Sequence, residues 1–333
     1  MKIAVVGLGS IGRRHIKNLK TIDPSFEIAV LRRHSQSADA GDVADLVSRI
    51  FFEEAQALAW APAVVVIANP APWHIPAAMA FARGGAHVFI EKPLSVSLAG
   101  IDDLAHVCRA KNLTAMVGYV LRFSPPLIAL KKAIDQGMIG AVLSLQAHVG
   151  RYLPQWRPGG DYRDQVTARR ELGGGVILEL SHDIDYVRWL AGEVMEVGAL
   201  AQKVSALDID VEDLAEIHVR LKNGALAHIH LDMLDHAGRR GCRVIGSKGT
   251  LEWESQGADH CVRVWTGTES KWQTLYAVKD LDTNVMHIAQ WRHFLDCVTR
   301  GRQPLVGLEE GARVLRIALE ALRSSKQKAV IAL

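Results

Sequence analysis

The stretch KIAVVGLGSIG, residues 2–12, decides how the first part of the chain folds. A run of apolar residues leads into glycines at positions 7, 9 and 12, which have the spacing GxGxxG. A strand, a glycine turn and a helix in this order are typical of dinucleotide-binding folds, because the glycines let the backbone approach a pyrophosphate at the helix N-terminus. The alternative is a glycine-rich turn that holds no ligand. The motif predicts five cofactor-binding residues: Gly7, Gly9, Ser10, Ile11 and Gly12.

Short apolar strands and helical patterns alternate over the first 120 residues. Strands are predicted at 2–7, 26–32, 63–69, 86–91 and 114–119, and helices near 11–20, 37–48, 53–59, 73–83 and 97–111. Continuous Val, Ile and Ala strands separated by helices indicate a parallel sheet covered on both faces. Ligands of such doubly wound sheets bind at the carboxyl ends of the strands. We therefore expect an α/β, Rossmann-type NAD(P)-binding domain over residues 1–121.

The pattern changes over residues 122–333. Helices are expected there at 124–137, 176–191, 284–300 and 308–326. A strand is expected near 141–150, after the first helix. Between the second and third helices, strands follow one another directly at 196–204, 213–221, 225–234, 242–254 (with a turn at 247–250) and 261–267, and Asn223-Gly224 marks a hairpin turn between two of them. This order indicates an α+β domain with a mainly antiparallel sheet.

Composition limits the classes of protein that need considering. A length of 333 residues predicts two domains, and a formal net charge of +3 gives no signal of nucleic-acid binding. The four cysteines are far apart and form no CxxC pair, which favours reduced thiols. The chain opens on a strand rather than a signal peptide, and no apolar run approaches the ~18 residues that span a bilayer. We therefore expect a cytoplasmic protein without membrane or nucleic-acid partners.

The second predicted strand ends in Leu31-Arg32-Arg33-His34-Ser35. An Asp or Glu at this point would bind the ribose 2′-hydroxyl of NAD, and none is present. The guanidinium groups of Arg32 and Arg33 suit a 2′-phosphate, so the sequence favours NADP over NAD. Alternatively, both arginines are solvated surface charges and either cofactor binds.

Residues 88–95, VFIEKPLS, place Lys92 between Glu91 and Pro93 at the end of the fifth strand. Proline restricts the backbone of the residue before it, and a Lys-Pro bond can also be cis. A lysine fixed in this way can exchange a proton with a substrate hydroxyl while hydride leaves the neighbouring carbon. The alternative is a loop lysine beside a turn proline.

Residues 173–190, GGGVILELSHDIDYVRWL, predict a second group of proton-transfer residues. At about 100° per residue, one apolar stripe is formed by Leu180, Ile184, Val187 and Ala191. His182 lies nearly opposite this stripe, with Glu179 and Asp185 each three residues away on the same helix. A histidine flanked by carboxylates suits proton transfer, although a solvated helix face would have the same pattern.

Taken together, the motifs resemble the Gfo/Idh/MocA family, named for glucose-fructose oxidoreductase and inositol dehydrogenase. The resemblance covers nearly the full length and rests on GLGSIGRRH (7–15), NPAPWH (69–74), GGAHVFIEKPLS (84–95), VGYVLRFSP (117–125), GGGVILELSHDID (173–185) and GSKGTLEW (246–253). It implies a Rossmann domain followed by a domain with an open sheet that makes homodimer or homotetramer contacts. It also implies an NAD(P) cofactor and a sugar, cyclitol or nucleotide-sugar substrate.

The resemblance also implies roles for single residues. Lys92 would be the catalytic or substrate-orienting lysine and His182 the catalytic histidine. Asn69, His74 and Glu91 would lie near the cofactor, and Arg122 near its nicotinamide end and the substrate.

One departure from the family pattern concerns the acid that precedes the histidine. Family members usually carry an aspartate four residues before it, whereas here Glu179 stands three residues before His182. This spacing resembles an ELSH or DLSH branch associated with nucleotide-sugar and acidic-sugar biosynthesis. Asp185 fits an HxxD pattern and either assists the histidine or supports the helix.

The segment 151–172 is rich in aromatic and basic residues and precedes the histidine helix. Trp156 and Tyr162 are predicted substrate-binding residues, because aromatic faces pack on sugar rings, while the arginines suit carboxylates or phosphates. The alternative is an arm that contacts another subunit. His228 and His230 share one strand face, but no third ligand is evident, so no metal site is predicted and a half-exposed or subunit-contacting face is preferred.

The sequence therefore predicts an NAD(P)-dependent oxidoreductase that transfers hydride between a sugar-type secondary alcohol and C4 of nicotinamide. Lys92 and His182 would share proton transfer and substrate orientation, assisted by Glu179 or Asp185. Two other classes stay open. One is a hydrolase or lyase that retains its NAD and uses transient oxidation, and the other is a regulator that binds the cofactor without catalysis.

Overall fold

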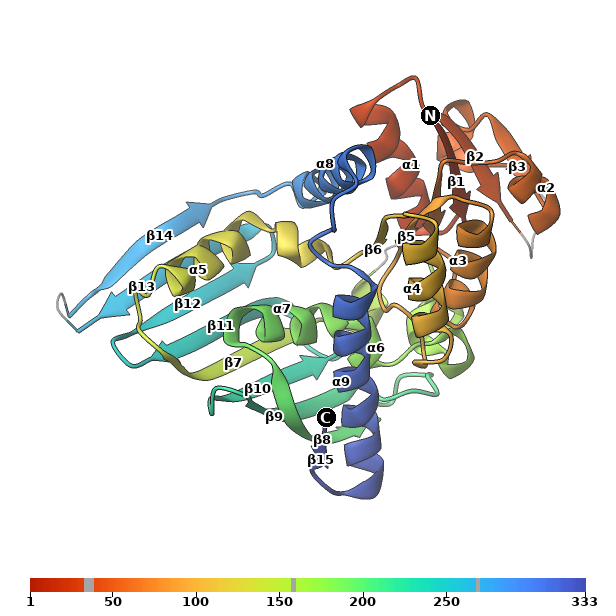
Figure 1. Cartoon of the computed structure of the whole chain (residues 1–333). Coiled ribbons are helices and arrows are strands. Elements are labelled where there is room, and N and C mark those ends of the chain that lie inside the picture. Colours follow the sequence, from red (N-terminus) through yellow and green to blue (C-terminus); the bar gives the residue numbers. More distant parts are fainter. Residues whose placement is uncertain (33–38, 157–159, 268–269) are drawn as a thin grey trace. The chain divides into compact units, whose positions relative to one another are not determined.

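The structure is a computed structural model that describes residues 1–32, 39–156, 160–267 and 270–333. The chain divides into two compact units. The first contains Met1–Tyr119 and Asn284–Arg313, and the second contains Val120–Thr283 and Val314–Leu333. Each unit has its own sheet (Figure 1).

The first unit is a doubly wound parallel sheet. Its elements are β1 (Lys2–Val6), α1 (Ser10–Ile22), β2 (Glu27–Leu31), η1 (Gly41–Leu46), β3 (Arg49–Phe51), α2 (Glu54–Ala59), β4 (Val64–Ile67), η2 (Ala71–Trp73), α3 (His74–Arg83), β5 (His87–Ile90), α4 (Ile101–Ala110), β6 (Ala115–Val117) and α8 (Asn284–Arg300). The strands follow the order β3-β2-β1-β4-β5-β6 and pair in parallel. Every residue of β4 is buried because α1 covers one face of the sheet and α3 and α4 cover the other (Figure 1). The predicted fold is confirmed, and the strand order reverses between β1 and β4, beside the glycine motif.

Helix α8 belongs to the first unit although it lies late in the chain. Its Trp291 and Phe294 are fully buried, and the Trp291 ring stacks on Phe89 of β5 with 4.6 Å between ring centroids. The sequence boundary at residue 121 assigned this helix to the second domain. The helix joins the first unit because its aromatic face completes the core around β5.

The second unit is built on a mixed, mainly antiparallel sheet, as predicted. Its elements are η3 (Val120–Phe123), α5 (Pro125–Asp135), β7 (Val142–Gly150), η4 (Leu153–Gln155), η5 (Tyr162–Asp164), η6 (Val166–Ala168), η7 (Arg170–Leu172), α6 (Val176–Glu179), α7 (Ser181–Ala191), β8 (Val194–Gln202), β9 (Leu214–Leu221), β10 (Leu226–Asp232), β11 (Arg239–Gly246), β12 (Gly249–Gln256), β13 (Asp259–Thr266), β14 (Trp272–Val278), α9 (Leu308–Gln327), which begins in the first unit, and β15 (Ile331–Ala332). The strand order is β14-β13-β12-β11-β7-β10-β9-β8-β15, and β7 and β10 pair in parallel. The hairpin predicted at Asn223-Gly224 joins the antiparallel strands β9 and β10.

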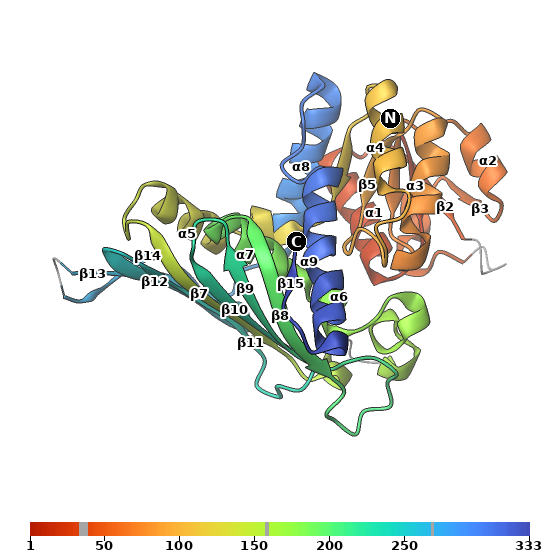
Figure 2. The ribbon, with the colours of Figure 1, turned by 60° about the horizontal axis from the view of Figure 1, so that its bottom comes forward.

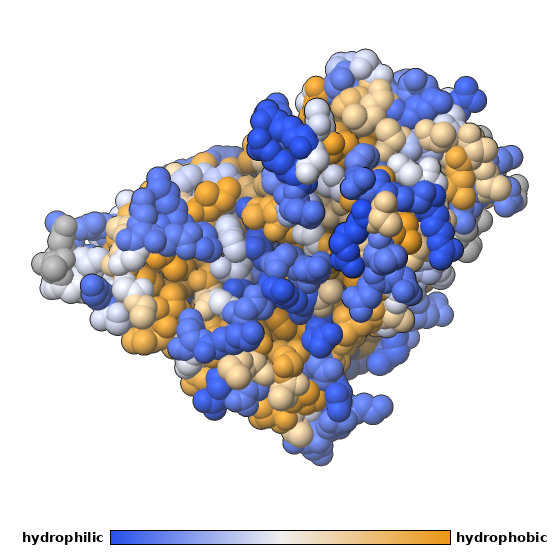
Figure 3. All heavy atoms as spheres, in the orientation of Figure 1, coloured by the Kyte–Doolittle hydropathy of each residue, from blue (hydrophilic) through white to orange (hydrophobic). Residues whose placement is uncertain are grey.

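The second sheet has one covered and one uncovered face. Helices α5, α7 and α9 lie on one face, and Figure 2 shows no described helix on the other. Burial alternates accordingly along β7, where Leu145, Ala147 and Val149 are buried beneath the helices. The outer side of α9 is polar (Figure 3) and carries an Arg323–Glu320 ion pair at 3.2 Å. The uncovered face is therefore the feature of this unit that a second chain could cover.

Several elements differ from the sequence prediction. The strands β3, β14 and β15 were not predicted, and the helix expected at 37–48 is the shorter 3₁₀ turn η1 in its described part. The helix expected at 176–191 is interrupted at Leu180, where the N–H of Asp183 bonds the Leu180 carbonyl three residues back. Among the described residues, no helix has both the length and the apolar character needed to cross a bilayer.

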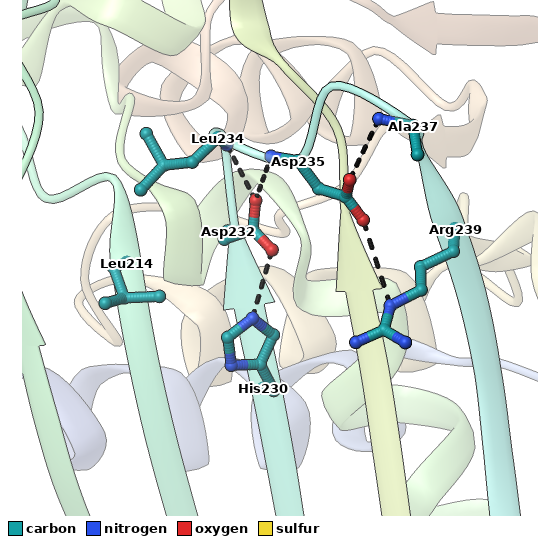
Figure 4. A pocket seen from close by; sticks show the side chains of 7 residues that line it. All are labelled: Leu214, His230, Asp232, Leu234, Asp235, Ala237 and Arg239. Atoms are coloured by element: carbon teal, nitrogen blue, oxygen red, sulfur yellow. Dashed lines mark hydrogen bonds and ion pairs between the residues drawn. The ribbon is translucent and has the colours of Figure 1, made fainter.

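A row of histidines and carboxylates crosses the uncovered face, and two of its members, His230 and Asp232, line a surface pocket (Figure 4). His230 Nδ1 lies 2.7 Å from Glu216 Oε1, and its Nε2 lies 3.0 Å from Asp232 Oδ2. His228 Nε2 lies 2.7 Å from the other oxygen of Glu216. Both nitrogens of His230 therefore face acceptors, which favours the imidazolium form.

The stability that His230 contributes should disappear in alkaline solution. The side-chain hydrogen bond with Asp232 outweighs burial and raises the pKa of His230 from 6.5 to about 9. Because the folded pKa is the higher one, the contribution is complete below pH 6.5 and is lost as pH rises through about 9. We expect His230→Gln to lower the free energy of unfolding by about 1 kcal/mol or less at pH ~6, because the side chain is partly exposed, and to have no effect at pH ~10.

Urea unfolding of wild type and variant at the two pH values measures this difference. His236→Gln is the control, because His236 stacks on Tyr152 outside the row of histidines and carboxylates. A His230 effect of equal size at both pH values would contradict the assignment.

Candidate active site

The glycine motif forms the turn from β1 into α1, and two of its three glycines are required sterically by the fold. Gly7 has a φ of +99°, and a Cβ there would lie 2.7 Å from the Ala68 carbonyl oxygen. A Cβ on Gly12 would lie 2.2 Å from the Gly7 carbonyl oxygen. At Gly9, in contrast, a Cβ would meet no described atom within 4 Å. Gly7 and Gly12 therefore close the turn, while Gly9 faces open space.

This turn fits a dinucleotide pyrophosphate. Gly9 is the N-cap of α1 and makes no side-chain cap, so the first N–H groups of the helix can bind an anion above the open Gly9 surface. Ser10 and Ile11 supply the first residues of that helix. Asn69, just after β4, has a buried Oδ1 without a hydrogen-bond partner among the described residues. The N-terminus of α1 is therefore suited to an anion such as the pyrophosphate of a nicotinamide dinucleotide, and the role of Asn69 stays a prediction.

The same substitution at Gly9 and Gly12 should have opposite effects. Gly12→Ala should lower the free energy of unfolding by about 1–3 kcal/mol, because its Cβ collides with backbone. Gly9→Ala should leave the unfolding free energy unchanged and weaken cofactor binding at least about tenfold, because its Cβ occupies the pyrophosphate side. Urea unfolding and calorimetric cofactor titration of both variants check this. Unimpaired binding by Gly9→Ala would contradict the assigned anion site.

The residues predicted to select NADP are only partly described. Arg32 follows β2, and its guanidinium donates to the Asp39 carbonyl at 2.7 Å. Arg33 lies outside the described residues. Arg13 of α1 reaches the same loop and pairs with Asp42 at 2.8 Å. The pKa of Asp42 is lowered mainly by its hydrogen bond from Lys17.

The Lys92–Pro93 peptide bond at the end of β5 is cis. Glu91 is buried, its Oε1 lies 2.7 Å from His15 Nε2, and its Oε2 accepts the Lys92 backbone N–H at 3.2 Å. The carboxylate therefore ties the backbone of Lys92 to α1. Burial opposes ionisation of Glu91, yet the pKa of this carboxyl lies below its ordinary value, above all because of its hydrogen bond with His15.

His74 joins this turn to the loop after β4. It is buried, with Nε2 2.6 Å from the Asn69 carbonyl and Nδ1 3.0 Å from the Pro93 carbonyl. Burial lowers the pKa of His74, and a neutral imidazole donates to one of these two carbonyls at a time. The predicted cofactor residue His74 thus links the Asn69 loop to the Lys92–Pro93 turn.

In the second unit, ion pairs fix the helix that carries His182. Arg122 of η3 donates from Nε and Nη2 to the two oxygens of Asp185, each at 2.8 Å, and its guanidinium lies 5.0 Å from the Trp189 ring centroid. Asp183 pairs with Arg240 of β11 at 2.9 Å. Burial raises the pKa of Asp183 although Arg240 opposes this effect. His182 itself is half-buried in the first turn of α7.

The glycine run before α6 allows two close approaches. A Cβ on Gly174 would lie 2.4 Å from the Val166 carbonyl oxygen, and one on Gly175 would lie 2.4 Å from Glu212 Oε1. Glu212 accepts the Ile177 N–H at 3.3 Å, and burial raises the pKa of its carboxyl group. Glu179 ends α6, so the acid and His182 lie on consecutive helices rather than on one.

The aromatic and basic segment bonds both to itself and to the loop that carries Asp208 and Asp210. Trp156 donates from Nε1 to the Arg151 carbonyl at 2.7 Å, and Tyr162 Oη accepts the Asp208 N–H at 3.1 Å. Arg170 binds the Asp210 carbonyl at 2.8 Å. These contacts give the side chains structural partners, and substrate contact by Trp156 and Tyr162 stays a prediction.

Some residues of the site were missed by the sequence reasoning. Thr167 is fully buried, and its hydroxyl, like the amide oxygen of Gln165, has no hydrogen-bond partner among the described residues. Both lie beside the glycine run, which was the available signal. His15 stands in the quoted GLGSIGRRH motif, whereas its partner Trp291 lies far away in sequence and gave no signal. Among the described residues, no three potential ligands are grouped as a metal would require.

The fold and the open glycine turn define the chain as a dinucleotide-binding protein of the Rossmann class. Residues 1–119 match the model described as "Oxidoreductase family, NAD-binding Rossmann fold", and residues 127–252 match the GFO/IDH/MocA C-terminal domain. The two models together span more than half of the chain. The chain belongs to the Gfo/Idh/MocA oxidoreductase family, and it is an NAD(P)-dependent dehydrogenase.

Known relatives resemble the chain over its full length. It is 26% identical to a myo-inositol 2-dehydrogenase of Thermotoga maritima, over 98% of this chain and 97% of the relative. It is 24% identical to the scyllo-inositol 2-dehydrogenase (NAD(+)) of Bacillus subtilis, over 97% and 94%. The solved structure of a levoglucosan dehydrogenase in complex with NADH superposes with a TM-score of 0.88 at 18% identity, over 100% and 98%. This last likeness supports the fold alone.

Proposed function

We propose that the chain transfers hydride between the carbinol carbon of a sugar, cyclitol or nucleotide sugar and C4 of a nicotinamide cofactor. The observation that carries this proposal is the Lys92–Pro93 turn, which is tied by Glu91 to α1 and by His74 to the Asn69 loop. A lysine whose backbone is fixed beside the predicted cofactor loops suits proton exchange with a substrate hydroxyl. The names of the inositol dehydrogenase relatives support a polyhydroxylated substrate.

Each residue has a role in the proposed oxidation. Bound NAD(P) would supply the hydride acceptor. Lys92 takes the hydroxyl proton as the carbon–oxygen bond gains double-bond character, and His182 orients that hydroxyl and shares the proton. Glu179 or Asp185 assists His182, with Asp185 acting through its pair with Arg122.

The proposed cofactor preference is NADP, on the basis of Arg32, Arg33 and the missing acid after β2. Calorimetric titration of NADPH and NADH into the apo protein tests it. Tighter binding of NADPH than of NADH would support the NADP preference, and tighter binding of NADH would contradict it. Arg32→Ala should lower NADPH affinity and leave NADH affinity unchanged. Failure to bind either cofactor, with none copurifying, would overturn the oxidoreductase proposal itself.

The net change in the amount of free reduced cofactor distinguishes the proposed dehydrogenase from an NAD-retaining hydrolase or lyase and from a non-catalytic regulator. A hydrolase or lyase that retains NAD forms product without changing the free cofactor pool. A regulator binds the cofactor tightly and converts no substrate. Equal amounts of oxidised alcohol and reduced nicotinamide are the result that the proposal requires.

We also propose that the chain forms a homodimer or homotetramer through the uncovered face of the second sheet. Leu200, Leu226, Ile245 and Trp265 lie on the strands of this sheet and are 69%, 56%, 37% and 37% exposed. Large exposed apolar side chains on one sheet face favour association. Sedimentation velocity measures the state, and Leu200→Glu should shift it toward monomer. A wild-type monomer at micromolar concentration would contradict the proposal.

A further inference from the structure

Helix α8 reaches the Lys92 turn through two buried side chains to which the proposed reaction gives no role. Trp291 of α8 donates from Nε1 to Nδ1 of His15 at 2.9 Å. His15 Nε2 in turn lies 2.7 Å from Glu91 Oε1. His15 and Trp291 are fully buried, and Glu91 is 8% exposed. Figure 1 shows α8 beside α1, the two helices that this row connects.

The direction of the first hydrogen bond fixes the proton on His15. An indole N–H can only donate, so Nδ1 of His15 must present its lone pair to Trp291. The ring proton is therefore on Nε2, which donates to Glu91. A second proton on Nδ1 would point at the indole N–H, so the geometry holds His15 in its neutral form.

Aromatic packing keeps the indole N–H in place. Trp291 stacks on Phe89 at a 23° interplanar angle and meets the His15 ring edge-on, with 5.4 Å between centroids. Phe294 packs edge-on against Trp291 at 5.7 Å. Trp291 is enclosed on these sides, so its N–H cannot turn away from His15. Protonation of His15 Nδ1 would need that movement.

The neutral His15 leaves the charge of Glu91 uncancelled. A cationic histidine would form an ion pair with this carboxylate, whereas a neutral one only donates a hydrogen bond. Glu91 also approaches Gly118, where a Cβ would lie 3.0 Å from Oε1, so the carboxylate is confined on that side as well. Its second oxygen binds the Lys92 backbone N–H at 3.2 Å.

We propose that Trp291 sets the tautomer of His15, and that Trp291 and His15 are positioning residues that leave the negative charge of Glu91 uncompensated by a histidine cation behind Lys92. The inference about the tautomer stands on the first unit alone. Its consequence for activity rests on the proposed catalytic role of Lys92. Trp291→Phe keeps an aromatic ring and removes the N–H, so His15 becomes free to take a second proton.

The other charged and titratable groups around His15 would not produce the ionisation that is expected for His15 in Trp291→Phe. Arg14 lies on the same helix and donates to Nε2 of His287 at 3.1 Å. His287 lies on α8 with its ring centroid 6.4 Å from that of His15, and burial lowers the pKa of His287 to about 4. A new ionisation in Trp291→Phe at mildly acidic pH therefore belongs to His15.

Nitrogen NMR of the histidine-labelled full chain tests the tautomer directly. The wild-type His15 ring should show one protonated and one unprotonated nitrogen, with the proton on Nε2, across the pH range in which free histidine titrates. In Trp291→Phe, both nitrogens should become protonated as pH falls through that range. A wild-type His15 that is doubly protonated, or protonated on Nδ1, overturns the proposal whether or not the variant folds.

Kinetics test the consequence for the Lys92 turn. Trp291→Phe should lose activity about tenfold on the acid side of the pH profile and recover at higher pH, with KM for the alcohol little changed. Adding His15→Gln to the Trp291→Phe variant should restore the wild-type pH profile, because an amide donates to Glu91 without titrating.

Trp253→Phe is the matched control. Trp253 is 1% exposed, and its N–H donates to His260 in the second unit, at 3.3 Å. It should leave the pH profile unchanged. A Trp291→Phe profile identical to that of wild type overturns the positioning role. If no alcohol is oxidised by any form, the proposed function fails while the NMR result still decides the tautomer.

Discussion

Replacing Lys92 by Met should lower the rate of hydride transfer by about 10²–10⁴-fold and leave the dissociation constant of the cofactor nearly unchanged. Methionine keeps the side chain as far as the Cε position and removes the amine that exchanges the proton. The backbone N–H that binds Glu91 is kept, so the turn should keep its geometry. Stopped-flow measurement of nicotinamide reduction and calorimetric cofactor titration supply the two numbers.

Lys111→Met is the matched control for this prediction, because Lys111 is exposed at the end of α4. It removes the same charge from the same unit and should change neither number. Full activity in Lys92→Met would refute the catalytic assignment. Loss of cofactor binding together with activity would instead make Lys92 a cofactor-binding residue.

Removing one partner of the Arg122–Asp185 pair should lower the free energy of unfolding by about 3–5 kcal/mol. Both side chains are buried, at 3% and 0% exposure, so Asp185→Asn leaves the Arg122 cation without its carboxylate in a nonpolar setting. Arg122→Met should cost a similar amount by leaving the carboxylate buried. The double variant Arg122→Met with Asp185→Leu should recover much of the loss, because two apolar side chains replace the two charges.

Urea unfolding of the four proteins forms a double-mutant cycle for this pair. The exposed Lys131–Asp135 pair on α5 is the control, and Asp135→Asn should change the free energy of unfolding by about 0.5 kcal/mol or less. Independent, additive losses at positions 122 and 185 would contradict a coupled buried pair. The same variants also distinguish support of the helix from assistance to His182 as the role of Asp185. If Asp185 assists His182, Asp185→Asn should be less active than wild type even under conditions in which the variant is fully folded.

Local patterns predicted most of the fold. β1, β4 and β5 are continuous apolar runs between helical patterns, so their parallel pairing follows from period and length. β3 was missed because a three-residue edge strand carries almost no periodic signal. β14 was missed because half-buried edge residues blur the alternation on which strand prediction depends. The membership of α8 depends on tertiary packing around Phe89, which no local pattern contains.

In the candidate site, too, local features could be predicted from the sequence and contacts between distant residues could not. The glycine turn and the Lys92–Pro93 turn could be predicted, because backbone geometry dictates glycine and proline locally. The Arg122–Asp185 pair and the Trp291–His15 contact could not, because their partners are 63 and 276 residues apart. The break at Leu180 also escaped, since helical periodicity continues through it and only the hydrogen bonds change. Arg33 lies outside the described residues, so its predicted role with Arg32 stays a prediction.

The most direct test of the proposed reaction is hydride transfer itself. The wild-type protein is mixed with cofactor and a panel of cyclitols, sugars and nucleotide sugars, each deuterated at the carbinol carbon, with Lys92→Met in parallel. We expect deuterium to appear at C4 of the nicotinamide in an amount equal to the oxidised product, and the variant to transfer none in the same time. Product that forms without deuterium in the free nicotinamide would contradict the account and favour an enzyme that retains its NAD.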